Sequence, residues 1–210
     1  PVVAVTGTNG KTTTVRLIEQ ILRYNNLRVG FTGTEGVVVN GHLIDTGDCS
    51  GPKSAHKVLV HPETDAAVLE CARGGMLREG LGFDMCDVGI VTNIGEGDHL
   101  GLNFIDSVED LALLKSVLVQ NVAPNGLAVL NADDKHAAGM AKLTPGRVLF
   151  FTSNPDNPVV AAHKAKGRPV IVHEGRVINI SYDGLEKTID LMEVPLTNNG
   201  LFTFQVQNVM

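Results

Sequence analysis

The sequence predicts an α/β fold in which a mostly parallel sheet carries helices on both faces and is extended by a small C-terminal antiparallel β subdomain. The first observation is that short, continuously apolar segments alternate with segments of helical spacing, as in parallel sheets covered on both faces. The second is that short strands and tight turns predominate beyond about Pro155. We therefore expect an α/β core at 1–154 and a β-rich extension of the same domain at 155–210.

The expected strands of the core are runs of Val, Ile, Ala and Leu, several of which end in polar residues. They lie at 2–5, 28–32, 66–70, 87–93, 127–130 and 147–151. A hairpin is expected at 37–44, with Asn40-Gly41 as its type I′ turn. In the extension we expect a small antiparallel sheet at the edge of the main one. Its strands are 170–172, 177–180 and 185–194.

The expected helices have apolar residues three and four positions apart. They lie at 11–25, 53–60, 76–80, 107–122 and 134–143. Ser107 is expected to cap the fourth of these helices, with Asp110 three residues further on completing the cap. The segment Arg73-Gly74-Gly75 is interpreted as a loop.

Composition excludes several classes of partner. The chain has 210 residues, a net charge of −6 and 4% aromatic residues without Trp, so neither nucleic acid nor an anionic membrane is an expected partner. No apolar run approaches the roughly 20 residues of a membrane span, and no signal peptide opens the chain. Cys49, Cys71 and Cys86 lack metal-binding spacing and are expected to be reduced thiols. The expected location is the cytoplasm.

The segment from Gly7 to Thr13 has the features of a phosphate-binding loop, which makes the expected sheet a P-loop-type sheet. An apolar strand leads into a Gly-rich turn, then into Gly10-Lys11-Thr12, and then into a helix. In such a loop the backbone N–H groups and the helix N-terminus attract phosphate, the lysine reaches the outer phosphates, and a Thr hydroxyl binds Mg²⁺. The strict motif has glycine where this chain has Val5, so the loop is a variant. The alternative is an ordinary strand–turn–helix junction.

Polar residues follow three other core strands, at Glu70, at Asp98 and His99, and at 131–134. Ligands of parallel sheets bind beyond the carboxyl ends of the strands, so these residues are expected to converge with the loop. Glu70, Asp98 and His99 have the chemistry of hard-cation ligands or of their supports. The structural alternatives are a helix cap for Glu70, a packed side chain for His99, and a turn with an N-cap for 131–134.

Lys115 lies on the expected buried stripe of its helix, four positions after Leu111. A buried ammonium group is unfavourable unless it is paired. Lys115 therefore either faces the site or extends along the edge of the stripe to solvent.

Together these residues resemble the central ATPase domain of the Mur ligase superfamily, whose members are ATP-dependent ligases that form amide bonds. The resemblance covers essentially the whole chain. It is carried by 6–13, Glu70, 92–100, Lys115 and 131–134. Finer features resemble one branch, the Mur-like region of the cyanophycin synthetases. They lie at 47–55, 69–75, 78–84, 99–102 and 206–209.

The resemblance implies roles for the matching residues. ATP would be held at its phosphates by Gly7, Thr8, Asn9, Gly10, Lys11, Thr12 and Thr13, and towards its adenosine by Asn131, Asp133 and Asn208. Mg²⁺, as two ions, would be held by Thr12, Thr13, Glu70, His99 and Lys115, the last matching a lysine that is carbamylated in many relatives. Lys11, Lys115 and His99 would be the catalytic residues. Relatives usually have one residue fewer between Asn93 and Asp98.

The implied reaction has two steps. A carboxylate attacks the γ-phosphate of ATP to give an acyl phosphate and ADP, and an amine then attacks the acyl carbon to give an amide and phosphate. In the cyanophycin synthetases this region joins arginine to the β-carboxylate of aspartate in a growing polymer. Ser50, Arg73 and Arg78 are then candidate residues for the amino-acid or peptide substrate. Surface salt bridges are the alternative for the two arginines.

Other functions are left open. A folylpolyglutamate or murein-type ligase is disfavoured by the segments 48–52 and 71–75, and a P-loop kinase or GTPase by the lack of an Asn-Lys-x-Asp motif. A nucleotide-binding module without activity of its own is a further alternative. Both ends look cut, so we expect neighbouring domains, including a C-terminal domain in cis that closes over the nucleotide, and little turnover by this chain alone. A homo-oligomer is compatible with the sequence.

Overall fold

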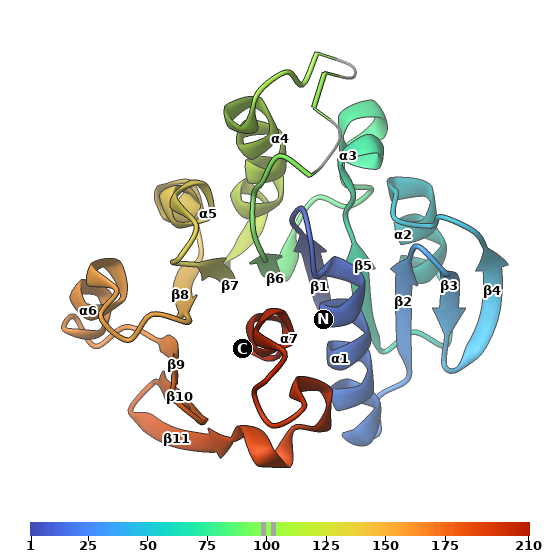
Figure 1. The fold of residues 1–210 in the computed structure, drawn as a ribbon. Coiled ribbons are helices and arrows are strands. Elements are labelled where there is room, and N and C mark those ends of the chain that lie inside the picture. Colours follow the sequence, from blue (N-terminus) through green and yellow to red (C-terminus); the bar gives the residue numbers. More distant parts are fainter. Residues whose placement is uncertain (98–99, 102–103) are drawn as a thin grey trace.

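The computed structural model describes residues 1–97, 100–101 and 104–210, and its described strands form one sheet (Figure 1). The strands are β1 (Val2–Thr6), β2 (Val29–Gly33), β3 (Gly36–Val39), β4 (His42–Thr46), β5 (Ala66–Glu70), β6 (Cys86–Val91), β7 (Val122–Asn131), β8 (Arg147–Thr152), β9 (Val170–Glu174), β10 (Val177–Tyr182) and β11 (Leu185–Asp190). Across the sheet their order is β11-β10-β9-β8-β7-β6-β1-β5-β2-β3-β4. Seven neighbouring strands, β9-β8-β7-β6-β1-β5-β2, pair in parallel. Antiparallel strands extend the sheet at both ends.

Helices cover both faces of the sheet. They are α1 (Lys11–Tyr24), α2 (Pro52–Leu59), α3 (Arg73–Glu79), α4 (Val108–Gln120), α5 (Lys135–Gly139), α6 (Pro158–Lys164) and α7 (Thr203–Val209). Figure 1 shows α2 to α6 on one face and α1 and α7 on the other. Across the described ranges, no helix combines the length and the hydropathy that a membrane span requires. The predicted fold class is confirmed.

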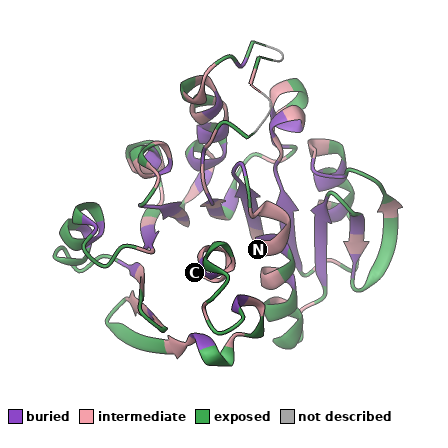
Figure 2. Ribbon diagram, viewed as in Figure 1, coloured by how far each residue is buried: buried purple, intermediate pink, exposed green. Residues whose placement is uncertain are grey.

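The side chains of β1 point alternately to the two faces of the sheet, and this explains why helices cover both faces. Val3 and Val5 belong to a buried cluster with Val15 of α1, whereas Ala4 belongs to the cluster that contains Leu111 of α4. Side chains of a strand point to opposite faces in turn, so a strand that is apolar at every position is buried on both sides. Figure 2 shows the central strands as buried, while β4 and β11 at the two ends of the sheet are largely exposed.

Several predicted elements are present with small shifts. The Asn40-Gly41 turn has positive φ angles of 50° and 82°, as its residue types require. Ser107 and Asp110 form a reciprocal capping box at the start of α4. That helix ends at Gln120, and β7 begins at Val122 rather than at residue 127, so the predicted end of the helix is wrong by two residues and the predicted start of the strand by five.

Other predictions about secondary structure are wrong. Arg73-Gly74-Gly75, expected as a loop, is the first turn of α3. The extension contains the expected antiparallel strands, and also the helices α6 and α7, which were not expected. The segment 185–194 remains a strand only to Asp190 and then forms a 3₁₀ turn. The extension continues the main sheet, because β9 pairs in parallel with β8 across the expected boundary. The division at residue 154 stays a prediction.

Candidate functional site

The loop between β1 and α1 depends on two glycines. Gly7 has a φ of 148°, and a Cβ atom there would lie 1.9 Å from Oγ1 of Thr92. Gly10, with a φ of 86°, occupies the N-cap position of α1 in the left-handed region. Val5, where the strict motif has glycine, is fully buried within β1. The loop therefore turns at Gly7, two residues later than the strict motif would suggest, and the valine serves the core.

The end of β6 holds this loop in place. Oγ1 of Thr92 donates to the carbonyl oxygen of Asn9 at 2.6 Å, and N of Asn9 donates to Oδ1 of Asn93 at 2.9 Å. The amide of Thr8 donates to the carbonyl of Asn93 at 2.8 Å. Thr92 and Asn93 were expected at a polar strand end and within a segment that resembles the Mur ligases, without a role of their own. Their position directly after a strand expected beside β1 is the signal that would have identified them as supports of the loop.

The groups at the end of the loop are able to bind an anion. The first amides of an α-helix have no intrahelical acceptor, so those of Lys11, Thr12 and Thr13 are available at the N-terminus of α1. The ammonium group of Lys11 folds back over the loop and donates to the carbonyl oxygens of Gly7 and Thr8 at 2.9 and 3.0 Å. A phosphate at this position would meet backbone N–H groups, a lysine and the positive end of the helix dipole together.

Glu70 lies at the carboxyl end of β5, beside the first turn of α1. Its side chain is buried, and its Oε2 accepts a hydrogen bond of 2.9 Å from Oγ1 of Thr12. Burial raises the pKa of this carboxyl group, and the hydrogen bond from Thr12 and the charge of Lys11 oppose that rise. The hydrogen bond joins two oxygen ligands of the kind that hard divalent cations prefer.

Lys115 reaches the same loop from α4. The residue is fully buried, and its Nζ donates to the carbonyl oxygen of Gly7 at 3.0 Å. The alternative that this side chain extends along the helix to solvent is therefore wrong. The structure thus brings Lys11, Thr12, Glu70 and Lys115 together around one turn of backbone.

Asp98 and His99 lie outside the described residues, so their predicted metal role stays a prediction. Within the part of the chain that the structure describes, no group of three or more His, Cys, Asp or Glu residues is arranged to hold a metal ion. Glu70 is the described carboxylate at the loop, and its oxygen neighbour is a threonine.

Two of the residues predicted near the adenosine have their polar atoms engaged within the protein. Nδ2 of Asn131 donates to the carbonyl of Thr92 at 2.8 Å, and its Oδ1 accepts from the amide of Asp133 at 2.9 Å. The carboxylate of Asp133 accepts hydrogen bonds from three groups near the end of β8. These donors are Thr152 Oγ1, Ser153 N and Asn157 Nδ2. Both side chains therefore fix the turn after β7, as the structural alternative proposed, and their role towards a nucleotide stays a prediction.

Asn208 is brought to the loop although it lies near the end of the chain. Helix α7 packs beside α1 (Figure 1), and a Cβ atom at Gly10 would lie 2.2 Å from Oδ1 of Asn208. Nδ2 of Asn208 donates to Gln205 of the same helix at 2.9 Å. The amide of Asn208 is thus next to the helix N-terminus at which a phosphate would bind.

The three predicted substrate residues lie around the start of α3. Ser50 is buried, and its carbonyl accepts from the amide of Ala72 at 3.0 Å. Arg73 is buried as the first residue of α3. Arg78 is exposed and lines a cavity of about 510 Å³ together with the segment around Ser50. Among the described residues, Arg78 has no carboxylate partner, so the alternative of a surface salt bridge does not hold for it.

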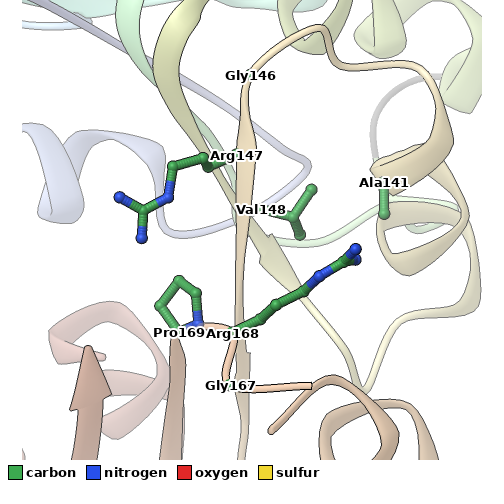
Figure 3. A pocket seen from close by; sticks show the side chains of 7 residues that line it. All are labelled: Ala141, Gly146, Arg147, Val148, Gly167, Arg168 and Pro169. Carbon is green, nitrogen blue, oxygen red and sulfur yellow. The ribbon is translucent and has the colours of Figure 1, made fainter. Parts of the chain in front are cut away.

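A second cavity, of about 440 Å³, contains two further arginines (Figure 3). Arg147 and Arg168 line it, and Arg147 forms a salt bridge with Asp183. Arg147 is the first residue of β8, so this cavity lies at the amino ends of the parallel strands. Ligands of such sheets bind at the opposite edge, where the phosphate loop lies.

Comparison with known proteins identifies the family. A family model described as "Mur ligase middle domain" matches residues 5–210. The chain belongs to the Mur ligase middle-domain family. Similar curated proteins include a cyanophycin synthetase of Trichormus variabilis, 44% identical over 211 aligned residues, which cover all of this chain and 23% of the relative. A UDP-N-acetylmuramoyl-L-alanyl-D-glutamate–2,6-diaminopimelate ligase of Chlorobaculum tepidum is 31% identical over 202 residues, which cover 92% of this chain and 38% of the relative.

A solved structure supports the Mur ligase fold. A UDP-N-acetylmuramoyl-L-alanyl-D-glutamate–2,6-diaminopimelate ligase matches with a TM-score of 0.65 and 24% identity, over 90% of this chain and 38% of that one. The chain thus spans about a quarter of the cyanophycin synthetase that it matches.

Proposed function

We propose that this chain is the nucleotide-binding part of an ATP-dependent ligase that forms amide bonds through an acyl phosphate. We further propose that the reaction is that of the cyanophycin synthetases, the addition of arginine to the β-carboxylate of aspartate. Relatives named cyanophycin synthetase match the whole chain at 42–44% identity, against 31% for the murein-type relative, and this difference favours the first substrate class over the second. The chain spans 23% of one such relative, and the proposal includes a C-terminal domain in cis that closes over the nucleotide.

One observation carries the proposal: Lys11, Lys115 and the Thr12–Glu70 pair meet at the loop that begins at Gly7. Transfer of a phosphoryl group needs little covalent chemistry from a protein, and most catalysis comes from positioning and from neutralising negative charge. The loop amides and Lys11 would bind the β- and γ-phosphates. A carboxylate substrate held beyond the strand ends would then attack the γ-phosphorus as ADP leaves.

The described residues supply some of the ligands that a divalent cation needs. Glu70 and Thr12 offer oxygen ligands, and the carboxylate of Glu70 is buried with Lys11 and Lys115 as the cations that act on it. We propose that Glu70, Thr12 and Thr13 hold Mg²⁺, with His99 and a carbamylated Lys115 completing two ion sites. Mg²⁺ supplies charge neutralisation at the transferred phosphoryl group. A carbamate on Lys115 would also replace a buried cation by an anion beside the loop.

The experiment that tests the nucleotide assignment is calorimetric titration of the chain with ATP and Mg²⁺. We expect weak binding that Lys11→Ala abolishes, because the lysine supplies the charge nearest the outer phosphates. Lys53→Ala is the matched control, since Lys53 is exposed and pairs with Glu79 at 3.1 Å. Absence of ATP binding by the unmodified chain, or equal binding by the Lys11 variant, would overturn the assignment.

The substrate assignment is tested in the longer protein that this proposal implies. We expect mass spectrometry to show one arginine added per aspartate when ATP, arginine and an aspartate polymer are supplied. Products with glutamate or a murein peptide in place of arginine would instead favour the other ligases of the superfamily.

A further inference from the structure

The loop between β1 and α1 is joined to the segment that follows β6 by a reciprocal pair of hydrogen bonds. Oγ1 of Thr8 accepts from the amide of Gly95 at 2.9 Å and donates to the carbonyl oxygen of the same residue at 3.2 Å. Thr8 is buried, and hydrogen bonds shielded from water are electrostatically stronger than exposed ones. The position of Gly95 therefore fixes the side chain of Thr8 within the loop.

Asp134, in the turn after β7, holds the same segment. Its Oδ2 accepts a hydrogen bond of 2.6 Å from the amide of Ile94, the residue before Gly95. Strand β6 ends at Val91, so Ile94 and Gly95 have left the sheet, and their amides donate to side chains rather than to a neighbouring strand. The segment therefore takes its position from Asp134 and Thr8.

The carboxylate of Asp134 is itself held in place. Its other oxygen, Oδ1, accepts from the amides of His136 and Ala137 at 2.9 and 3.0 Å and caps the start of α5. The turn in which Asp134 lies is tied to β8 through the side chain of Asp133. A side chain whose rotamer is locked in this way holds its partner with precision. Asp134 is thus a rigid anchor for Ile94.

The hydrogen bonds of Asp134 exceed what a helix cap needs. A cap uses one side-chain oxygen to accept from the first amides of the helix, and asparagine does this as well as aspartate. The second polar atom of asparagine is a nitrogen, which cannot accept from the amide of Ile94. The carboxylate at position 134 therefore meets a need of the segment after β6, in addition to that of α5.

We propose that Asp134 is a positioning residue for the phosphate-binding loop, and that it acts through Ile94 and Gly95 on Thr8. The inference rests on the proposed function and adds to it a residue outside the loop. Asp134 fixes the segment after β6, the segment fixes Thr8, and the loop amides keep the orientation in which they face a phosphate. Loss of this anchor weakens ATP binding although the loop amides and Lys11 are all still present.

The test is calorimetric titration of two variants of the chain with ATP and Mg²⁺. Asp134→Asn keeps the cap of α5 and loses the acceptor for Ile94. Thr8→Val keeps the shape of threonine and loses both hydrogen bonds to Gly95. We expect each variant to bind ATP about tenfold more weakly than the unmodified chain, since each loses buried or charged hydrogen bonds that hold the loop.

The double variant, Asp134→Asn with Thr8→Val, decides whether the two residues act along one path. If Asp134 acts through Thr8, the double variant binds ATP no more weakly than the weaker of the two single variants, because one broken link already frees the loop. Effects of residues in one network are not additive, whereas those of independent residues are. Fold-changes that multiply in the double variant would overturn the proposal.

Melting temperatures of the same samples separate positioning from a structural role. If Asp134 only stabilises the fold, Asp134→Asn lowers the melting temperature and its folded fraction binds ATP as tightly as the unmodified chain does. That result would also overturn the proposal. We expect the opposite, a melting temperature close to that of the unmodified chain together with weaker ATP binding.

Asp190→Asn is the matched control. Asp190 accepts from the amide of Met192 at 2.9 Å as the cap of a 3₁₀ turn, and its other oxygen accepts from Arg176 at 2.9 Å. The substitution again keeps a cap and loses a second interaction, but at the end of β11, on the outer edge of the sheet. This variant should bind ATP as the unmodified chain does.

The outcomes separate this inference from the function on which it rests. Equal ATP binding by the unmodified chain and Asp134→Asn, or equal weakening in Asp134→Asn and the control, rejects the positioning role alone. Absence of ATP binding by the unmodified chain rejects the proposed function.

Discussion

The buried ammonium group of Lys115 donates a hydrogen bond to the carbonyl oxygen of Gly7, 3.0 Å away. Lys11 donates to the same oxygen at 2.9 Å, so the two nitrogens lie within about 6 Å of each other. Two cations at this distance repel each other, most strongly where one of them is shielded from water. An anion between or on these lysines relieves the repulsion. The carboxylate of Glu70 acts on both lysines, and we propose that a bound phosphate, or a carbamate on Lys115, adds further negative charge beside them.

The first prediction concerns Lys115→Met. We expect the variant to stay folded, because an apolar side chain of similar length fills the space of Lys115 and Lys11 still donates to Gly7. Ligation by the longer protein should fall at least tenfold, since the charge beside the loop is lost. Urea denaturation and product formation measure the two effects. A variant that loses several kcal/mol of stability, and whose folded fraction keeps normal activity, would show that Lys115 is only structural.

The positions of these residues could be predicted because strand ends and helix stripes are local patterns. Glu70 ends an apolar run, and Lys115 follows Leu111 by four residues, so each could be placed on a parallel sheet or a helix face before the structure was known. The first turn of α3 could not be predicted, because glycines at positions 74 and 75 disfavour a helix. Their contact with Gly51 is a tertiary effect that no local pattern contains.

Helices α6 and α7 of the extension were not predicted from the sequence for a different reason. Asn157 and Pro158 are ordinary signals for a helix start, and Asn157 caps α6, although no helix was expected there. Helix α7 has only one buried residue, Val206, so it lacks the apolar stripe that sequence patterns detect. The hydrogen bonds of Asn131 and Asp133 in the turn after β7 likewise depend on partners distant in sequence, Thr92 just after β6 and Thr152 in β8.

The second prediction concerns the pH dependence that Glu70 confers. Burial raises its folded-state pKa above the ordinary value of 4.5. For a carboxyl group with a raised pKa, the contribution to stability is present below the unfolded-state pKa and is lost as the pH rises through the folded-state pKa. At neutral pH the buried charge therefore destabilises the fold, and Glu70→Gln should melt at a higher temperature than the unmodified chain. Near pH 4 this difference should shrink.

Thermal unfolding of both proteins at pH 4 and pH 7 measures this effect, and the comparison within each pH cancels the other titrating groups. The variant should also lose the dependence of ATP binding on Mg²⁺, because an amide is a poorer ligand for a hard cation than a carboxylate. Equal melting temperatures at both pH values would contradict the effect of burial. If ATP binding by the variant depended on Mg²⁺ as before, Glu70 would not be a ligand of the metal ion.

The third prediction concerns Gly7→Ala. The φ of 148° is unfavourable for any residue with a side chain, and the new Cβ atom would lie 1.9 Å from Oγ1 of Thr92. The loop must then move away from the end of β6, which breaks the hydrogen bond from Thr92 to Asn9. Since the loop amides and Lys11 bind phosphate only in their present orientation, we expect the affinity for ATP to fall at least tenfold, as measured by calorimetric titration.

Gly95→Ala is the matched control for this change. Gly95 belongs to the segment that follows β6 and contacts Thr8, yet a Cβ atom there would meet nothing within 4 Å and its φ is not positive. This variant should bind ATP as the unmodified chain does. If both substitutions weakened ATP binding equally, ATP binding would depend on any change around the loop and not specifically on the backbone conformation of Gly7. Full affinity in Gly7→Ala would mean that phosphate is bound elsewhere, because the backbone conformation observed at Gly7 cannot survive the added methyl group.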